Sequence, residues 1–298
     1  MTLTSIMTSS ANAIMAFQDG LDVTTANVSN AATYGAKRIS ISFKEVFNRI
    51  VSGGYPASFG QYSVSSNPIQ FGGQVAVADT RVDFAQGEIS LGGNMTVAIN
   101  GNGLFIVSPD GGTTKYYTRN GDFRLDPVTK NIVDSSGRVV YGYKLGQDGK
   151  PDTTQLVPLN AGTETDVGFL PGGILVGNYT AWYNSSQGST SQQGQQVVAY
   201  KPLNQQLALT TFPNINGLLA VDGVAFKASS VSGSPVVPVV SGTDWAGQVA
   251  ARSLEKSNIN ISVETVNALE YQRAMNASLT MLKLASDELT NFINRIGG

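Results

Sequence analysis

Pairs of carboxylates are the first candidates for chemistry in this chain, because two Asp or Glu side chains that flank a glycosidic bond can hydrolyse it. Nothing in their spacing singles out an acid and a base among Asp122, Asp126, Glu164 and Asp166. The chain has neither His nor Cys, which removes the commonest general base and metal ligand and the thiolate nucleophile. We therefore predict no enzyme activity and no catalytic, cofactor-binding or metal-binding residue, and keep a secreted carbohydrate-active β enzyme as the minor alternative.

Two glycine-rich turns and one acidic turn have the residue types of ligand loops but not their context. Residues 101–103 read GNG and residues 111–112 read GG, and a strand-like run follows each, where a phosphate cradle requires a helix. Residues 148–152 read DGKPD and lack the closing Glu of a calcium loop. We interpret all three as turns.

Composition limits the possible partners. The 298 residues carry a net charge of -2 and are 41% hydrophobic, which is enough for more than one domain and offers no basic surface to nucleic acid. No apolar run is long enough to span a bilayer, so we expect no membrane insertion. The first basic residue is Lys37, and the polar start is unlike a secretory signal. The location is therefore cytosolic by default, unless a route without a cleaved signal exports the chain.

The elements that position these residues begin with the C-terminal stretch 262–296, which contains neither Pro nor Gly. Apolar residues recur in it every seven positions, which is the period of a coiled-coil seam. Such a helix would be about 50 Å long and needs a partner to cover its stripe. Asn260 or Ser262 can cap its start. The predicted seam comprises Ala268, Tyr271, Met275, Leu279, Leu282, Leu289, Phe292, Ile293 and Ile296.

The first thirty residues carry the same period and predict a second helix, which Gly20 interrupts at a cost of about 1 kcal/mol relative to Ala. The simplest closure lays this helix along the C-terminal one, whereas in the alternative each helix covers a globular core. Charged residues near the stripes, Glu264 among them, are interpreted as a solvated face or as pairs between subunits. The N-terminal seam comprises Met7, Ile14, Phe17, Leu21 and Val28.

The middle of the chain follows different patterns. Residues 48–75 have no period and predict an extended arm that orders against neighbours. From residue 76 to 252, alternating runs and short turns predict a mostly antiparallel β domain, polar and turn-rich over 146–205 and with an exposed tip near 180–200. The expected fold is α+β, with paired, coiled-coil-like terminal helices (1–47 and 253–298) and the β domain inserted between them.

Three groups of motifs occur at both ends of the chain and in the early β region. Residues 21–37 read LDVTTANVSNAATYGAK. The second group is FAQG at residues 84–87, VAINGNGLF at 97–105 and YTRNGDF at 117–123, and the third begins with LEKSNIN at residues 254–260. Together they resemble the bacterial flagellar axial proteins, the rod and hook family, although Ala36 stands where an aromatic is usual. The positions that carry the resemblance are Asn27, Asn30, Gly35, Gly101, Gly103, Arg119, Gly121, Leu254, Glu255, Ser257, Asn258, Gln272 and Arg273.

The resemblance implies a structural subunit, a distal-rod or a hook protein, that polymerises helically into a hollow tube. It implies that the terminal helices line an inner channel, the β domain packs outside them, and the tube transmits motor torque. Its partners would be copies of itself, other flagellar rod, hook, junction and ring proteins, and the type III export apparatus with a chaperone. The location would be the flagellum, periplasmic to extracellular. A filament cap or scaffold protein is the other alternative.

Overall fold

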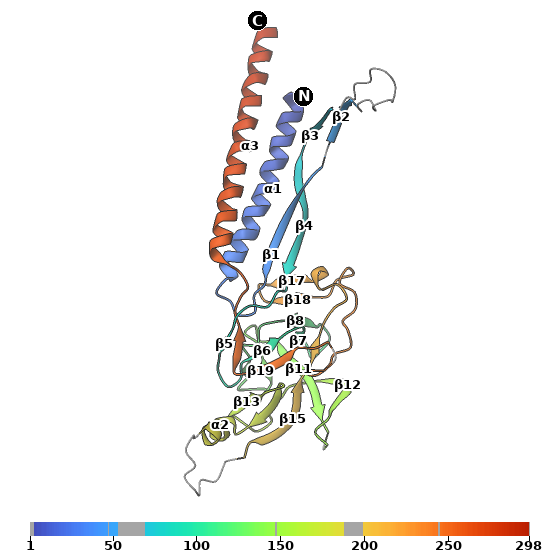
Figure 1. Ribbon diagram of the computed structural model, residues 1–298, viewed down its shortest axis with the longest axis vertical. Helices are drawn as coiled ribbons and strands as arrows, with labels where there is room; N and C mark the ends of the chain where they lie inside the picture. The colour runs from blue at the N-terminus through green and yellow to red at the C-terminus, as the bar shows by residue number, and fades with distance from the viewer. Residues whose placement is uncertain are drawn as a thin grey trace, which may run out of the picture. The chain divides into compact units, whose positions relative to one another are not determined.

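The computed structural model describes residues 3–46, 48–52, 69–146, 148–187, 199–243 and 245–297 (Figure 1). It forms two compact units. The first comprises Met1–Ser29, Ile39–Val82 and Asn260–Gly298, and the second comprises Asn30–Arg38 and Asp83–Ile259. Helices at both ends of the chain and a mostly antiparallel β region between them confirm the α+β fold class.

The first unit is built on two long helices, α1 (Leu3–Asn30) and α3 (Ile261–Ile296), which run antiparallel and side by side (Figure 1). The Asn260 side chain caps α3 by accepting from the backbone N–H groups of Ser262 at 3.0 Å and Val263 at 3.3 Å, as one of the two predicted caps. No helix among the described residues is long and apolar enough to cross a membrane.

Gly20 does not interrupt α1, which continues through it. Its Cα is buried, and a Cβ there would lie 3.0 Å from the Tyr271 ring of α3 and 3.2 Å from the Phe43 ring. Phe43 lies between two aromatic rings, 5.6 Å from that of Phe17 and 5.5 Å from that of Tyr271. The missing side chain therefore provides the space in which the two helices and a neighbouring strand meet.

A ribbon of strands completes the first unit. Strand β1 (Arg38–Glu45) pairs with β4 (Val75–Asp83), and β2 (Asn48–Ser52) pairs antiparallel with β3 (Ile69–Gly72). The ribbon is joined to α1, where the Asn12 amide donates to the Gln74 side chain at 2.9 Å. The described ends of the segment 48–75 are therefore extended strands, β2 and β3, and its role as an arm that orders against neighbours stays a prediction. Residues 53–68 of the predicted arm lie outside the described residues.

The second unit is a β structure in which every described strand pairing is antiparallel. Twelve of its described strands form one sheet, whose main path runs β13-β14-β15-β11-β7-β8-β18-β17. Two short ladders, β19 with β6 and β20 with β5, pair the last part of this unit with its beginning. The strands are β5 (Ile89–Leu91), β6 (Val97–Asn100), β7 (Leu104–Ser108), β8 (Tyr116–Thr118), β9 (Arg124–Leu125), β10 (Ile132–Val133), β11 (Val139–Leu145), β12 (Pro151–Pro158), β13 (Val167–Leu170), β14 (Ile174–Gly177), β15 (Lys201–Leu207), β16 (Leu209–Thr210), β17 (Leu219–Asp222), β18 (Ala225–Lys227), β19 (Gln248–Ala251) and β20 (Ser253–Glu255).

The core of this unit comes from the apolar runs that the sequence placed in strands. All of β7 is buried, and Phe105 packs edge-on against Phe123 with ring centroids 5.2 Å apart. Ile99 of β6, Leu159 and Leu175 are fully buried in the same cluster. Burying side chains of this size stabilises the fold by about 1.5–3 kcal/mol each, so this cluster holds the β unit together.

Residues 146–205 are more regular than the prediction of a polar, turn-rich segment. They contain β12 to β15 and a short helix, α2 (Tyr179–Gln187). Polar side chains are part of these strands: Gln206 of β15 donates to the Gly172 carbonyl at 2.9 Å, and Gln205 accepts from the Asn160 N–H at 2.8 Å. Polarity therefore concealed the strands. The predicted tip near 180–200 falls partly on α2, and residues 188–198 lie outside the described residues.

The unit boundaries fall at 82/83 and 259/260, whereas the sequence suggested 75/76 and 252/253. The physical reason is pairing. Strand β4 pairs with β1 of the first unit, and β20 pairs with β5 of the second. The division of roles among the predicted domains remains a prediction.

Candidate functional site

The carboxylates considered for catalysis each have a local structural partner. Asp122 pairs with Arg124 at 3.2 Å, and Glu164 with Lys201 at 2.7 Å. Asp166 accepts from the N–H and the hydroxyl of Thr180, at the start of α2, at 2.8 and 2.7 Å. Asp126 accepts from groups of the turn that follows it. Among the described residues no three His, Cys, Asp or Glu side chains gather as a metal site.

The motif residues, by contrast, converge within the second unit on Glu255. Lys37 Nζ lies 2.6 Å from Glu255 Oε1, and the same oxygen accepts from the Gly87 N–H at 2.9 Å. Arg119 Nε lies 3.1 Å from Glu255 Oε2, as an ion pair without hydrogen-bond geometry. The side chains of Lys37 and Glu255 are 0% exposed. We call this cluster of Lys37, Gly87, Arg119 and Glu255 the Glu255 junction.

Burial and charge oppose each other in the Glu255 junction. Burial lowers the pKa of Lys37, and the hydrogen bond and charge of Glu255 act against that shift. Burial likewise lowers the pKa of Arg119, again opposed by Glu255. One buried carboxylate therefore contacts two buried cations, and its removal would leave both without their nearest counter-charge.

Arg119 also fixes the first predicted turn. Its Nη1 donates to the carbonyl oxygens of Gly101 and Gly103 at 2.8 Å each. Those glycines have φ of +108° and +134°, which side chains with a Cβ rarely adopt. The GNG turn therefore links β6 to β7 and receives the arginine, which agrees with the interpretation as a turn and not as a phosphate cradle.

Two further motif glycines permit close backbone approach. Gly35 has φ +70°, donates its N–H to the Glu255 carbonyl at 2.8 Å, and leaves no space for a Cβ against the Asn120 backbone. A Cβ on Gly121 would overlap the Val97 carbonyl oxygen. Both positions bring segments that are distant in sequence into backbone contact.

The motif asparagines replace missing backbone partners. Asn258 accepts from the Arg38 N–H at 2.8 Å and donates to the carbonyls of Asp83 and Ala85 at 2.9 and 3.0 Å. It therefore holds three chain segments near the start and end of the second unit. Of the neighbouring motif residues, Leu254 is buried in β20, and the Ser257 hydroxyl accepts from the Ile259 N–H at 3.1 Å.

In the first unit, Asn27 has the same kind of role. Its side chain bonds both backbone groups of Ile39, at 2.7 and 2.9 Å, and its amide donates to Glu264 of α3 at 3.0 Å. Asn27 and Glu264 are both buried. The interpretation of Glu264 as part of a solvated face or of a pair between subunits was therefore wrong, because it joins α1 to α3 within one chain. Asn30 packs beside Gly223 in the second unit.

The predicted seam residues have two environments. Half-buried positions on α1 are Met7, Ile14, Phe17 and Leu21, and those on α3 are Ala268, Tyr271, Met275 and Leu282. The exposed positions are Val28, Leu279, Leu289, Phe292, Ile293 and Ile296, and the motif residues Gln272 and Arg273 are exposed as well. Their role at a subunit interface stays a prediction.

The seven-residue pattern missed a second apolar face on α3. Val263 and Met281 are eighteen residues apart, as are Val266 and Leu284, so five full turns separate the members of each pair and the four lie on one side. Val266 is 54% exposed and Leu284 57% exposed. A search at the 3.6-residue period of a straight helix would have found this face.

The polar groups of the Glu255 junction contact one another and the backbone, so they hold the β unit together. In comparison with known proteins, residues 98–166 match the family described as the flagellar hook protein FlgE/F/G D1 domain. The chain is 24% identical over 278 residues to the flagellar basal-body rod protein FlgG of Bacillus subtilis, covering 93% of this chain and 94% of that protein.

Two other relatives extend the comparison. The corresponding rod protein of Borreliella burgdorferi is 26% identical over 294 residues, with 96% of each chain covered. The flagellar hook protein FlgE of Helicobacter pylori is 31% identical over 173 residues, which are 56% of this chain but 24% of the hook protein. The chain is thus similar to flagellar rod proteins over most of its length and to a flagellar hook protein over about half of it.

Proposed function

We propose that this chain is a rod subunit of the flagellar axial structure and that copies of it stack helically into a hollow tube. The tube would transmit motor torque and carry the export channel. The comparisons favour rod over hook, because the alignment with rod proteins covers 94% and 96% of their length and that with the hook protein covers 24%. The role is mechanical, and the proposal assigns no reaction to the chain.

The two units would divide this role. Helices α1 and α3 would form the inner wall as a coiled-coil-like pair, and the β unit would pack outside them. The ribbon of β1 to β4 would reach neighbouring copies. The partners would be other copies and the adjoining rod, hook, junction and ring proteins. Delivery would use the type III export apparatus and a chaperone, without a cleaved signal, which would place the chain in the periplasmic to extracellular part of the flagellum.

The observation that carries the proposal is the second apolar face of α3. Four large side chains lie along one side of the helix, and about half of the surface of each is exposed. Full burial of an exposed side chain of this type yields about 1.5–3 kcal/mol, so covering the exposed half yields about half of that for each of the four, which favours a contact between copies. A contact between two different surface patches builds an open helical filament when the rotation between successive copies does not close a ring.

Electron microscopy of the purified chain at high concentration tests this function. The unmodified chain is expected to form tubes or filaments. Leu284→Asp is expected to abolish them, because it places a charge in the apolar face. Thr290→Asp is the matched control, since it adds the same charge to an exposed position six residues from Leu284, about 120° away around the helix. Filaments that persist in Leu284→Asp would contradict the assembly surface, and a chain that only decorates the ends of existing filaments would favour a cap protein.

A further inference from the structure

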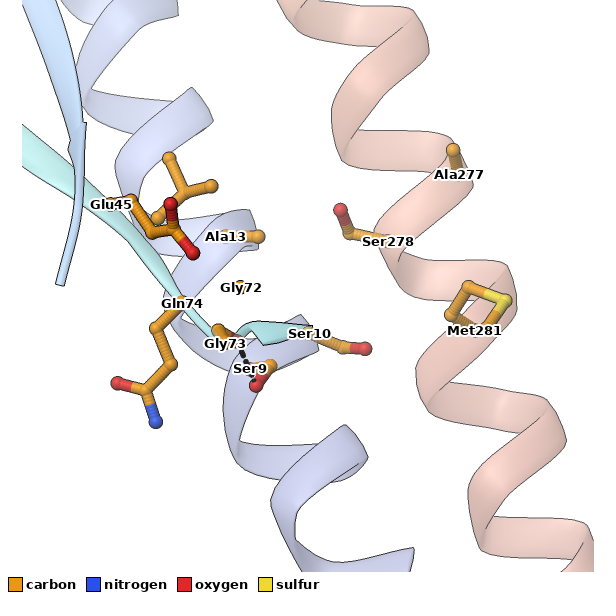
Figure 2. Close-up of a pocket in the computed structure, with 11 residues that line it drawn as sticks. Ser9, Ser10, Ala13, Glu45, Gly72, Gly73, Gln74, Ala277, Ser278 and Met281 are labelled. Carbon is orange, nitrogen blue, oxygen red and sulfur yellow. Dashed lines mark hydrogen bonds between the residues drawn. The ribbon is translucent and has the colours of Figure 1, made fainter. Parts of the chain in front are cut away.

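The first unit contains a cavity of about 520 Å³ between α1, the ribbon and α3. Figure 2 shows Ser10 of α1 and Ser278 of α3 projecting into the space between the helices, with Met281 one turn further along. The ribbon supplies residues 72–75, two of which are glycines. Most of the lining residues are Ser, Ala or Gly, so the space between the helices is left open by small side chains.

One wall of this cavity carries a negative charge. Glu45 of β1 lines it beside Gly72, and its carboxylate lies so close to that glycine that a Cβ there would overlap it. Ala13 and Met281 give the other walls an apolar character. An occupant that fits therefore presents large apolar side chains and a cation next to them.

The last two turns of α3 present such a group. Phe292 and Ile296 are four residues apart and share a helix face, and Arg295 lies between them in sequence on the adjoining part of that face. Phe292 is 57% exposed and Ile296 70% exposed. We call these three residues the α3 tip.

The α3 tip does not fill the cavity of its own chain. Asn27 of α1 contacts Glu264 of α3, and Gly20 contacts Tyr271. Because the two helices are antiparallel, the residue numbers of facing positions add up to the same value, 291, in both cases. By the same rule Ser10 faces the level of Met281, with which it lines the cavity, whereas Phe292 lies eleven residues further along α3, about 16 Å away. Within one chain the two surfaces are therefore separated along the helix axis.

We propose that the cavity between α1, the ribbon and α3 receives the α3 tip of a second copy of this chain. Phe292 and Ile296 would fill the space left by the small residues, and Arg295 would approach Glu45. The choice of a second copy rests on this charge complementarity and on the match between small lining residues and large exposed ones. The contact joins two different patches, so it can repeat from copy to copy along a helical filament. The inference rests on the proposed polymer and specifies one contact in it.

Disulfide trapping tests the contact, and the chain offers a clean background because it contains no Cys. Two full-length variants, Ser10→Cys and Ile296→Cys, carry different tags and are assembled together. Oxidation of the filaments is expected to give a mixed disulfide, because the bond forms only when the two Cβ atoms come within about 4.5 Å. The matched control replaces Ser10→Cys with Thr280→Cys, which lies on α3 outside the cavity, and is expected to give none.

The outcomes separate the contact from the polymer. Filaments with the Ser10–Ile296 bond and without the control bond support the inference. Filaments in which neither or both bonds form overturn it and leave the polymer standing. An unmodified chain that never polymerises contradicts the proposed function and this inference together.

A charge exchange gives a second measurement that does not depend on oxidation. Glu45→Arg and Arg295→Glu are each expected to raise the concentration needed for assembly by about threefold, the size of an exposed ion pair's contribution. The double variant is expected to return to the unmodified value, because the pair is restored in the opposite sense. A double variant that assembles worse than either single one would overturn the pairing of Glu45 with Arg295.

Discussion

The buried carboxylate of Glu255 joins three separate segments of the β unit through its contacts with Lys37, Gly87 and Arg119. Desolvating three charged side chains costs several kcal/mol each, and the cost is recovered only when each charge keeps its partners. Here one carboxylate accepts from a lysine and a backbone N–H and pairs with an arginine, and all three side chains are buried. The cluster therefore fixes which segments meet, since any other pairing would leave a charge unmatched.

Glu255→Gln keeps the shape of the side chain and removes its charge, so Lys37 and Arg119 would remain buried without the carboxylate that both contact. We expect the free energy of unfolding of the β unit to fall by about 3–5 kcal/mol. Urea denaturation followed by tryptophan fluorescence measures it, because both tryptophans, Trp182 and Trp245, belong to this unit. The control is Glu88→Gln, which removes an exposed pair with Lys256 and is expected to change little. If both variants lowered the free energy of unfolding equally, the larger cost expected for removing a buried charge would be contradicted.

Asp126 is a second residue whose environment makes a measurable prediction. The Thr129 hydroxyl, followed by the N–H groups of Val128 and Thr129, lowers the pKa of the Asp126 carboxyl below its usual 3.8. Because the folded pKa lies below the unfolded one, this stabilisation is complete above pH 3.8 and is lost as pH falls through the folded value. NMR titration is expected to give a higher pKa in Thr129→Val. An unchanged pKa would assign the shift to other groups.

At the scale of elements, the contact between α1, α3 and β1 depends on the absence of a side chain at Gly20. A Cβ there would lie 3.0 Å from Tyr271, so an alanine requires a small shift of that ring while gaining about 1 kcal/mol of helix propensity. We expect Gly20→Ala to leave stability nearly unchanged and Gly20→Leu to separate the helices. Circular dichroism melting of the helical signal distinguishes them. Equal melting of Gly20→Leu and the unmodified chain would contradict this packing.

The elements also show what could be predicted from the sequence. Both long helices follow from apolar periodicity and from an uninterrupted run such as residues 262–296, and these are local signals. Alternation of apolar and polar residues indicated strands at β1 and β4, but β2 and β3 could not be predicted, because they are short paired strands separated by a long glycine- and serine-rich segment. Strand β15 was hidden because its glutamines bond backbone groups that only the fold brings near.

The candidate site divides in the same way. The motif pointed to Gly35, Arg119 and Glu255 separately, but the fold brings Gly35 to the Glu255 backbone carbonyl and Arg119 to its carboxylate. Lys37 follows Gly35 by two positions and lies within the same motif, yet nothing local marks it as the partner of Glu255. The second apolar face of α3 was accessible from the sequence, but a search limited to the seven-residue period follows one stripe.

For the whole molecule, the β unit is closed by chain segments that lie more than two hundred residues apart. Gly35 donates to the Glu255 carbonyl, and Asn258 bonds the Arg38 N–H. In the same way, strands β19 and β20 near the end of the unit pair with β6 and β5 near its beginning. The folded β unit therefore requires its first and its last residues together. Helices α1 and α3 take no part in these pairings.

This closure predicts how a dilute, unassembled chain responds to limited digestion with a protease of broad specificity such as subtilisin. Cleavage requires local opening, and opening costs least where few apolar side chains are buried. Only Glu264 and Ala285 of α3 are buried among its described residues. We expect both helices to be removed early. The resistant core is expected to retain Gly35 and Asn258, and any fragments within it stay associated through the contacts between its first and last residues. Mass spectrometry of the resistant core gives its ends. A monomer in which both helices survive as long as the β unit would show that the apolar faces are already covered within one chain, and the driving force proposed for assembly would be absent.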